Sequence, residues 1–357
     1  MHRHTNAVKV GNITIGNGAP IAIQSMLSVP STDIEGSVRQ AISLQNAGCQ
    51  IIRAAIPDMN AVALIPALKN AVSMPAVADI HFDYRLALAA VEAGVDKIRI
   101  NPGNIGSDDR VHAVADACGE KGIPIRIGVN SGSLEHDILT KYGAPTAEAL
   151  CESAAYHASL LEKFGFHDIV LSLKSSDLVT MIEAYRLASQ KFPYPLHLGV
   201  TEAGTSRMGL IKSAIGIGSL LADGIGDTIR VSLTAPPEEE IAAARDILRA
   251  LGMPGCGVQI VSCPTCGRTR IDLAALAHET EKRLARCPRD IKVAVMGCVV
   301  NGPGEAREAD YGIAGGDDCG LLFSHGEILG KYPQEALVDE LIRLIEAGEH
   351  IKIEEVD

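Results

Sequence analysis

Short apolar segments alternate with amphipathic segments eight times along the chain, and this alternation constrains the fold more than any other feature. The apolar segments predict strands at Pro20–Met26, Gln50–Ile56, Ala76–Ile80, Lys97–Asn101, Pro124–Val129, Asp168–Leu173, Leu196–Val200 and Thr228–Leu233. The amphipathic segments predict helices near residues 35–47, 59–71, 83–93, 107–121, 146–164, 177–190, 207–222 and 237–251. Eight strand–helix units match the size of an α/β fold of the (β/α)8 TIM-barrel type. An open doubly wound sheet is the rival fold, and the count of eight favours the barrel.

The two ends of this alternating region suggest how the chain is divided. Ala7–Ile15 predicts a hairpin with its turn at Gly11-Asn12, which we expect to cap the barrel floor. A run rich in Gly and Pro at residues 252–257 predicts a domain boundary. We therefore expect a TIM-barrel domain with its hairpin over residues 1–251, and a second domain over residues 258–357.

The second domain has its own pattern. A strand is predicted at Lys292–Met296, another apolar run at Gly320–Ser324 and a final helix near residues 334–347. This pattern predicts a small α+β domain of about 100 residues, a normal size for an independent fold.

Composition narrows the class of protein. The net charge of −12 argues against a general nucleic-acid binder. The chain begins without an apolar signal core and has no apolar run long enough to span a bilayer. Nine cysteines without an export signal predict reduced thiols, so we expect a cytoplasmic protein.

Polar side chains gather at the carboxyl ends of the predicted strands, where TIM barrels build their active sites. They are Arg53, Asp79, His81, Arg99, Asn101, Asn104, Arg126, Asn130, Lys174, His197, Glu202, Arg230 and Ser232. Cations at one mouth repel one another unless an anion or fixed carboxylates balance them, and phosphate or diphosphate is the usual anion. Any one of these residues could be structural: an arginine paired with an acid, His197 in the core, or Asp79 and His81 capping a helix. Their recurrence across the strands predicts an anion site.

Three cysteines in the last third of the chain carry a second signal. Cys263-Pro-Thr-Cys266 places two thiolates on one tight turn, and Cys298 lies in a turn whose glycines leave room for an inorganic group. Three thiolates without an obvious fourth suggest an iron–sulfur cluster with one open position, which suits a redox enzyme.

Other interpretations of the Cys-x-x-Cys motif are a structural zinc corner, a redox-active disulfide or two buried thiols. A zinc site needs four ligands, and no second Cys-x-x-Cys completes one. Pro264 and Gly267 fit poorly with a thioredoxin-type motif that opens a helix. We therefore favour the cluster.

Longer motifs make the chain resemble the 4-hydroxy-3-methylbut-2-enyl diphosphate synthase family, in its bacterial two-domain form. The matching segments are Val10-Gly11, Pro20–Met26, Lys97–Gly106, Arg126–Ser133, Leu196–Gly204, Asp227–Thr234, Ser262–Arg268 and Met296–Glu305. The loop Leu27-Ser28-Val29-Pro30 departs from the family, which has a threonine-rich stretch there.

The resemblance implies an iron–sulfur oxidoreductase of the methylerythritol phosphate pathway of isoprene biosynthesis. Such an enzyme opens 2-C-methyl-D-erythritol 2,4-cyclodiphosphate with two electrons and removes one hydroxyl as water. It also implies a ferredoxin or flavodoxin as electron donor, and a head-to-tail homodimer in which one subunit's cluster domain covers the other's barrel.

The resemblance further implies roles for single residues. Cys263, Cys266, Cys298 and Glu305 would hold one 4Fe–4S cluster per chain, and Glu202 would act with Glu305 in catalysis. The substrate contacts carried over are Arg53, Arg99, Arg126, Asn130, Lys174, Ser232 and Asn301.

Two rival functions remain at this point. The stretch from Asn301 to Gly316 also resembles the cluster domain of sirohaem-type sulfite and nitrite reductases, which need four cluster cysteines. A phosphate-binding barrel with a structural zinc domain is the other rival, and it needs no electrons.

Overall fold

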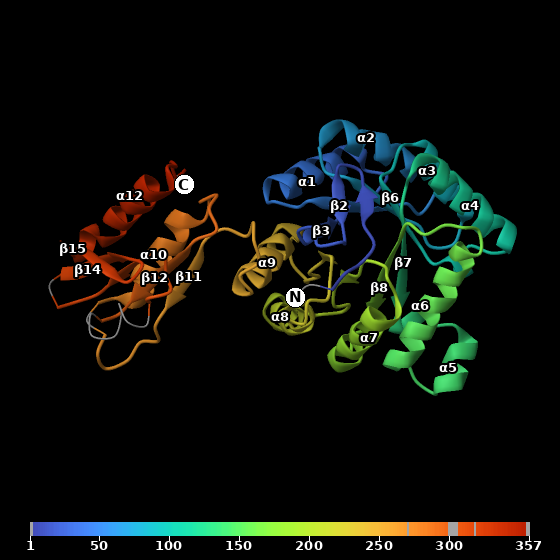
Figure 1. The fold of residues 1–357 in the computed structure, drawn as a ribbon. Helices are drawn as coiled ribbons and strands as arrows, with labels where there is room; N and C mark the ends of the chain where they lie inside the picture. The colour runs from blue at the N-terminus through green and yellow to red at the C-terminus, as the bar shows by residue number, and fades with distance from the viewer. Residues whose placement is uncertain (1–2, 270, 299–305, 318, 355–357) are drawn as a thin grey trace. The chain divides into compact units, whose positions relative to one another are not determined.

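The computed structural model describes residues 3–269, 271–298, 306–317 and 319–354. The chain divides into two compact units, Met1–Ile247 and Leu248–Asp357 (Figure 1). Each unit has its own sheet and its own core. No helix in the described ranges has the length and apolarity that a membrane span requires.

The first unit is built on an eight-stranded parallel sheet. In chain order its strands are β3 (Ala22–Met26), β4 (Ile51–Ala55), β5 (Ala76–Asp79), β6 (Lys97–Ile100), β7 (Ile125–Asn130), β8 (Ile169–Lys174), β9 (His197–Leu198) and β10 (Thr228–Ile229). They pair in the order β8-β7-β6-β5-β4-β3-β10-β9. A parallel bridge between Leu171 and Leu196 joins the two outer strands, and the Leu171 N–H donates to the Pro195 carbonyl at 2.9 Å. The sheet is thereby closed, and the predicted TIM barrel is confirmed.

Helices follow the strands and pack around them (Figure 1). They are α1 (Ile34–Asn46), α2 (Leu64–Ala71), α3 (Tyr84–Glu92), α4 (Asp108–Lys121), α6 (Ala147–Glu162), α7 (Leu178–Lys191), α8 (Ser206–Ala222) and α9 (Pro237–Ala250). Several begin where a side chain caps the first turn: Asp33, Asp83, Thr146 and Asp177 each accept a backbone N–H there. One short helix, α5 (His136–Tyr142), was not predicted, since its seven residues show no clear apolar period.

The hairpin β1 (Val8–Val10) and β2 (Ile13–Ile15) closes the amino end of the barrel. Gly11 takes a φ of +57° in its two-residue turn, a conformation that glycine adopts without strain. The buried hairpin side chains pack on residues at the start of four barrel strands, namely Ala22, Ile51, Val77 and Val170. The expected cap on the barrel floor is confirmed.

The second unit is a five-stranded mixed sheet with two helices. Its strands are β11 (Gln259–Ser262), β12 (Lys292–Met296), β13 (Tyr311–Ala314), β14 (Cys319–Ser324) and β15 (Glu327–Pro333), and its helices are α10 (Leu273–Leu284) and α12 (Leu337–Glu349). The first three strands are parallel, and β14 and β15 run antiparallel to their neighbours.

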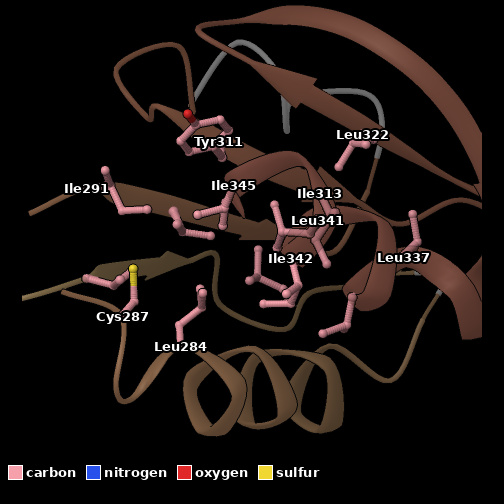
Figure 2. Packing of buried hydrophobic residues seen from close by; sticks show 14 of the residues in the cluster. Leu284, Cys287, Ile291, Tyr311, Ile313, Leu322, Leu337, Leu341, Ile342 and Ile345 are labelled. Carbon is pink, nitrogen blue, oxygen red and sulfur yellow. The ribbon is translucent and has the colours of Figure 1, made fainter. Parts of the chain in front are cut away.

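Both helices bury their apolar faces on this sheet. Leu284 from α10 and Leu341 and Ile345 from α12 join Ile313 from β13 in one core (Figure 2). The sequence predicted β12, β14 and α12, but it missed β11, β13, β15 and α10. β15 is mostly exposed, so it carries little of the hydrophobic signal by which strands are recognised.

Candidate active site

A pocket of about 580 Å³ opens among residues on the barrel strands and in the loops that follow them. The barrel residues predicted to bind substrate or to act in catalysis all line it: Arg53, Arg99, Arg126, Asn130, Lys174, Glu202 and Ser232. His81 and Arg230 line it as well. The parallel strands explain this, since they bring segments far apart in sequence to one end of the barrel.

Five cationic side chains meet in this pocket. They are Arg53 on β4, Arg99 on β6, Arg126 on β7, Lys174 on β8 and Arg230 directly after β10. Burial is the largest cause that lowers the pKa of Arg99, Arg126, Lys174 and Arg230, and Arg53 lowers each further. The protein therefore holds these charges close together and away from water, which favours binding of an anion.

Asp79 at the end of β5 is the carboxylate that holds part of this cluster. Its oxygens accept hydrogen bonds from Arg53 Nη2 at 2.8 Å and Arg99 Nη1 at 3.4 Å, and His81 Nε2 lies 3.5 Å away. Burial alone would raise the pKa of Asp79, but His81 and the two arginines hold it well below its usual range. Asp79 does not cap the next helix, because Asp83 fills that position.

Glu240 on α9 is a second buried carboxylate near the cations. One of its oxygens accepts the Leu233 N–H at 3.0 Å, and burial raises its pKa against the opposing effect of Arg230. Two buried carboxylates do not balance five cations. The pocket is therefore electropositive within an acidic protein.

Several guanidinium donors are not used by the described part of the protein. Arg53 Nε, Arg126 Nε and Nη2, and Arg230 Nε are buried and have no hydrogen-bond partner there. Arg126 is 1% exposed, and its remaining nitrogen Nη1 donates to Ser172 Oγ at 2.9 Å. Buried donors of this kind are usually paired, so a ligand with several acceptor oxygens would fit them.

Glu202 has an unusual backbone. It lies in the loop after β9 with a φ of +53°, a left-handed conformation that is uncommon for residues other than glycine. Its side chain is exposed and lines the pocket. Strain of this kind is concentrated at functional positions, where the surrounding structure holds it in place.

Some pocket residues were not predicted. Ser131 and Ser133 follow β7, Ser172 and Ser176 flank Lys174, and Thr201 precedes Glu202. Their position next to predicted site residues at strand ends was the signal available in the sequence. His197 does not line the pocket: it is fully buried, and its Nδ1 lies 2.8 Å from Thr228 Oγ1. It is therefore the core histidine that the sequence allowed as an alternative.

Two of the predicted cluster ligands come together in the second unit. Cys263 directly follows β11 and Cys298 lies two residues beyond β12, and these strands are parallel neighbours. The Gly297 N–H donates to Cys263 Sγ at 3.2 Å. Cys266 is exposed, and the backbone N–H of Arg268 lowers its pKa. Amide donors to sulfur and a favoured thiolate suit an iron–sulfur cluster.

Two further predicted site residues belong to the second unit, the cluster ligand Glu305 and the substrate contact Asn301. Asn301 and Glu305 lie outside the described residues. Within the described ranges, no group of three or more His, Cys, Asp or Glu side chains is arranged to hold a metal ion. Cys49, Cys118, Cys151, Cys256 and Cys287 are buried and Cys319 is exposed.

Comparison with known proteins agrees with this arrangement. A family model described as the GcpE TIM-barrel domain matches residues 5–245, and one described as the GcpE protein C-terminal domain matches residues 259–347. A relative from Clostridium perfringens is 60% identical over 96% of this chain and 99% of its own length. A relative from Fusobacterium nucleatum is 58% identical over 97% of this chain and 98% of its own. Both are named 4-hydroxy-3-methylbut-2-en-1-yl diphosphate synthase (flavodoxin).

Two solved structures of other proteins each cover about 70% of this chain. The 3-dehydroquinate dehydratase of Geobacillus kaustophilus aligns with a TM-score of 0.52 at 17% identity, covering 70% of this chain and 98% of that one. The dihydropteroate synthase of Yersinia pestis aligns with a TM-score of 0.50 at 15% identity, covering 69% and 98%. At such identities the likeness concerns the fold. Because both family models match in order and the relatives match nearly end to end, the family predicted from the motifs is confirmed, and the chain belongs to the GcpE family.

Proposed function

We propose that this chain catalyses the formation of 4-hydroxy-3-methylbut-2-en-1-yl diphosphate, the activity for which its curated relatives are named. Its substrate is 2-C-methyl-D-erythritol 2,4-cyclodiphosphate, and its electron donor is a flavodoxin or a ferredoxin. One observation carries the proposal: a pocket lined by five cations, of which Arg99, Arg126 and Lys174 are buried, suits a diphosphate. Neither rival function is supported by the family and relatives that match.

The buried cations bind and orient the diphosphate. Arg126 and Arg53 offer guanidinium nitrogens that have no other partner in the described ranges, and Lys174 offers an ammonium group. These groups stabilise the negative charge that develops on the phosphate oxygen when the ring opens. Asn130 and Ser232 contribute neutral hydrogen-bonding groups from neighbouring strand ends.

Glu202 moves a proton in the same pocket. Its carboxyl group lies in the pocket on an exposed loop, so it can exchange protons with water between turnovers. A proton held there assists departure of the substrate hydroxyl as water.

Cys263, Cys266 and Cys298 would hold a 4Fe–4S cluster, with Glu305 as its fourth ligand and Asn301 as a substrate contact. The position of Cys263 beside the Gly297 N–H and the turn that carries Cys298 supports this assignment. When bound, the cluster supplies the two electrons of the reduction one at a time. All nine cysteines are free, as a cytoplasmic location requires.

We also infer a head-to-tail homodimer in which the cluster domain of one subunit covers the barrel of the other. Exposed apolar side chains support it. Met59 and Phe82 lie in the loops after β4 and β5, and Met208, Ile211 and Ile215 lie on α8, which follows the Glu202 loop. Exposed apolar groups of this kind favour contact with another protein surface.

The test is an anaerobic assay of the reconstituted protein. We expect about four irons per chain, absorption near 400 nm, and oxidation of a reduced viologen dye that depends on the cyclic diphosphate. Cys298→Ser should lower the iron content, while Cys319→Ser should not, because Cys319 is not a proposed ligand. Bound zinc without visible absorption would contradict the proposal.

Arg126→Met separates the barrel's contribution from that of the cluster. We expect this variant to keep its iron and to lose dye oxidation, since Arg126 lies in the barrel. Arg85→Met is the matched control, because Arg85 is exposed, does not line the pocket and pairs with Asp83.

A further inference from the structure

Lys97 is a buried lysine that the proposed reaction does not use. It precedes Arg99 by two residues on β6, so both side chains point into the barrel and Lys97 lies about 7 Å deeper along the strand. Lys97 is 0% exposed, and its Nζ has no hydrogen-bond partner in the part of the chain that the structure describes. A lysine in such a place is costly to keep charged.

The charged and titratable groups that face the barrel interior come from every neighbouring element. They are Arg53 on β4, Asp79 on β5, Arg99 on β6, Arg126 on β7, Lys174 on β8, His197 on β9, Arg230 after β10 and Glu240 on α9. β3 contributes the neutral Gln24, and the hairpin cluster on the barrel floor is apolar. The buried Asp227, directly before β10, accepts hydrogen bonds from the Leu196 N–H at 2.7 Å and from Thr5 Oγ1 at 3.1 Å.

Neither carboxylate of this set is paired with Lys97. Asp79 binds Arg53 and Arg99, and Glu240 accepts the Leu233 N–H. Burial, followed by the charges of Arg126 and Arg53, lowers the pKa of Lys97 to about 7. Before any ligand arrives, Lys97 is therefore near the point at which it gains or loses its proton at neutral pH.

We propose that Lys97 takes up a proton when a diphosphate anion enters the pocket above it, so that anion binding and protonation of the barrel interior are coupled. This inference rests on the proposed diphosphate pocket. An anion held by Arg53 and Arg126 offsets the two charges that repel a proton from Lys97. The new ammonium in turn attracts the anion across a medium of low polarity, where charges act strongly.

Lys97 thus acts on the anion by its charge from a deeper position on β6, and it is not one of the proposed anion contacts. The coupling makes anion affinity depend on pH. Lys97 has one pKa when the pocket is empty and a higher pKa when the pocket holds an anion. At pH values between these two, anion affinity falls as pH rises, because binding then requires the uptake of a proton.

The experiment measures proton uptake during binding of inorganic pyrophosphate to the full-length reconstituted protein, kept anaerobic. Isothermal titration calorimetry at pH 8 in buffers of different ionisation enthalpy gives the number of protons bound. We expect the protein to take up close to one proton more than Lys97→Met does. From pH 7.5 to 8.5, the affinity for pyrophosphate should fall roughly tenfold more in the unaltered protein than in Lys97→Met. Ionisation of pyrophosphate itself affects both equally.

Lys121→Met is the matched control, since Lys121 lies on the outside and pairs with Glu92 at 2.7 Å. It should take up as many protons as the unaltered protein. Equal uptake in Lys97→Met would overturn the inference and would assign the proton to Lys174 or His197. Failure of pyrophosphate to bind the unaltered protein would instead reject the diphosphate pocket itself, and the inference with it.

A second measurement covers the case in which Lys97→Met does not fold. In the unaltered protein with ¹³C-labelled lysine, one side-chain signal should titrate near pH 7, and its midpoint should rise when pyrophosphate is added. Lys97→Arg, which keeps a permanent charge, identifies that signal by its disappearance. A spectrum in which no lysine assigned to residue 97 moves with pyrophosphate would overturn the inference.

Discussion

Arg99 and Gly128 are in direct contact inside the barrel: a guanidinium nitrogen of Arg99 donates to the Gly128 carbonyl at 2.9 Å. A Cβ atom at position 128 would lie 2.4 Å from Arg99 Nε, closer than real side chains approach. The absence of a side chain on one strand therefore creates the space in which the arginine of the next strand reaches the pocket.

Gly128→Ala should displace Arg99 and weaken binding of inorganic pyrophosphate by about tenfold, the effect of losing one charged hydrogen-bonding group. Isothermal titration calorimetry provides the dissociation constant. Gly218→Ala on α8 is the control, because a Cβ there meets nothing within 4 Å and alanine favours the helix. Unchanged affinity in Gly128→Ala would show that Arg99 does not contact the anion.

Asp79→Ala should destabilise the protein by about 3 kcal/mol, because Arg53 and Arg99 would lose their buried partner. The folded protein holds the pKa of Asp79 below its unfolded value, which is about 3.9. Its contribution is therefore fully present above about pH 4 and is lost as pH falls below that value. Urea unfolding at pH 6 and pH 3 should show a difference between protein and variant that shrinks in acid. Asp137→Ala, at an exposed position, should change little at either pH.

His157 on α6 contacts both the loop that follows β6 and the loop that follows β7. Its Nδ1 accepts the Gly103 N–H at 3.0 Å, and its Nε2 lies 2.6 Å from Glu135 Oε1. His157→Ala would leave the Gly103 N–H and Glu135 without this partner, which should lower the free energy of unfolding by about 1–3 kcal/mol. Urea unfolding measures it, with the exposed His136→Ala as control. A loss no larger than that of the control would contradict a role for His157 in holding the loops.

Substitutions of Glu202 are expected to lower activity without lowering the stability of the fold. Glu202→Gly removes the strain of a left-handed residue, so the free energy of unfolding should stay constant or rise by up to about 1 kcal/mol. Turnover of the cyclic diphosphate should nevertheless fall about a hundredfold, the usual contribution of a group that transfers a proton. Glu202→Gln keeps the backbone strain and should lose the same activity. Full turnover in either variant would reject the proposed proton transfer.

The order of the elements and the end of the barrel at which the site lies could be predicted from local sequence patterns. Apolar segments of strand length, each followed by an amphipathic helix, leave few arrangements other than a barrel. Arg53, Arg99 and Arg126 each lie within such a segment, and Lys174 directly follows one. The second domain was harder to predict, because β11 has no fully buried residue and β15 is largely exposed, so neither shows a clear apolar strand pattern.

The interactions among these residues could not be predicted from local patterns, because they depend on how the strands pack. Nothing in the local pattern distinguishes Lys97 from Lys174, or Gly128 from other glycines, because burial and charge depend on neighbouring strands. Closure of the sheet places Lys97 below the pocket without a carboxylate and places Asp79 between two arginines. Distances between strands set these electrostatic energies, and such distances exist only once the barrel has formed.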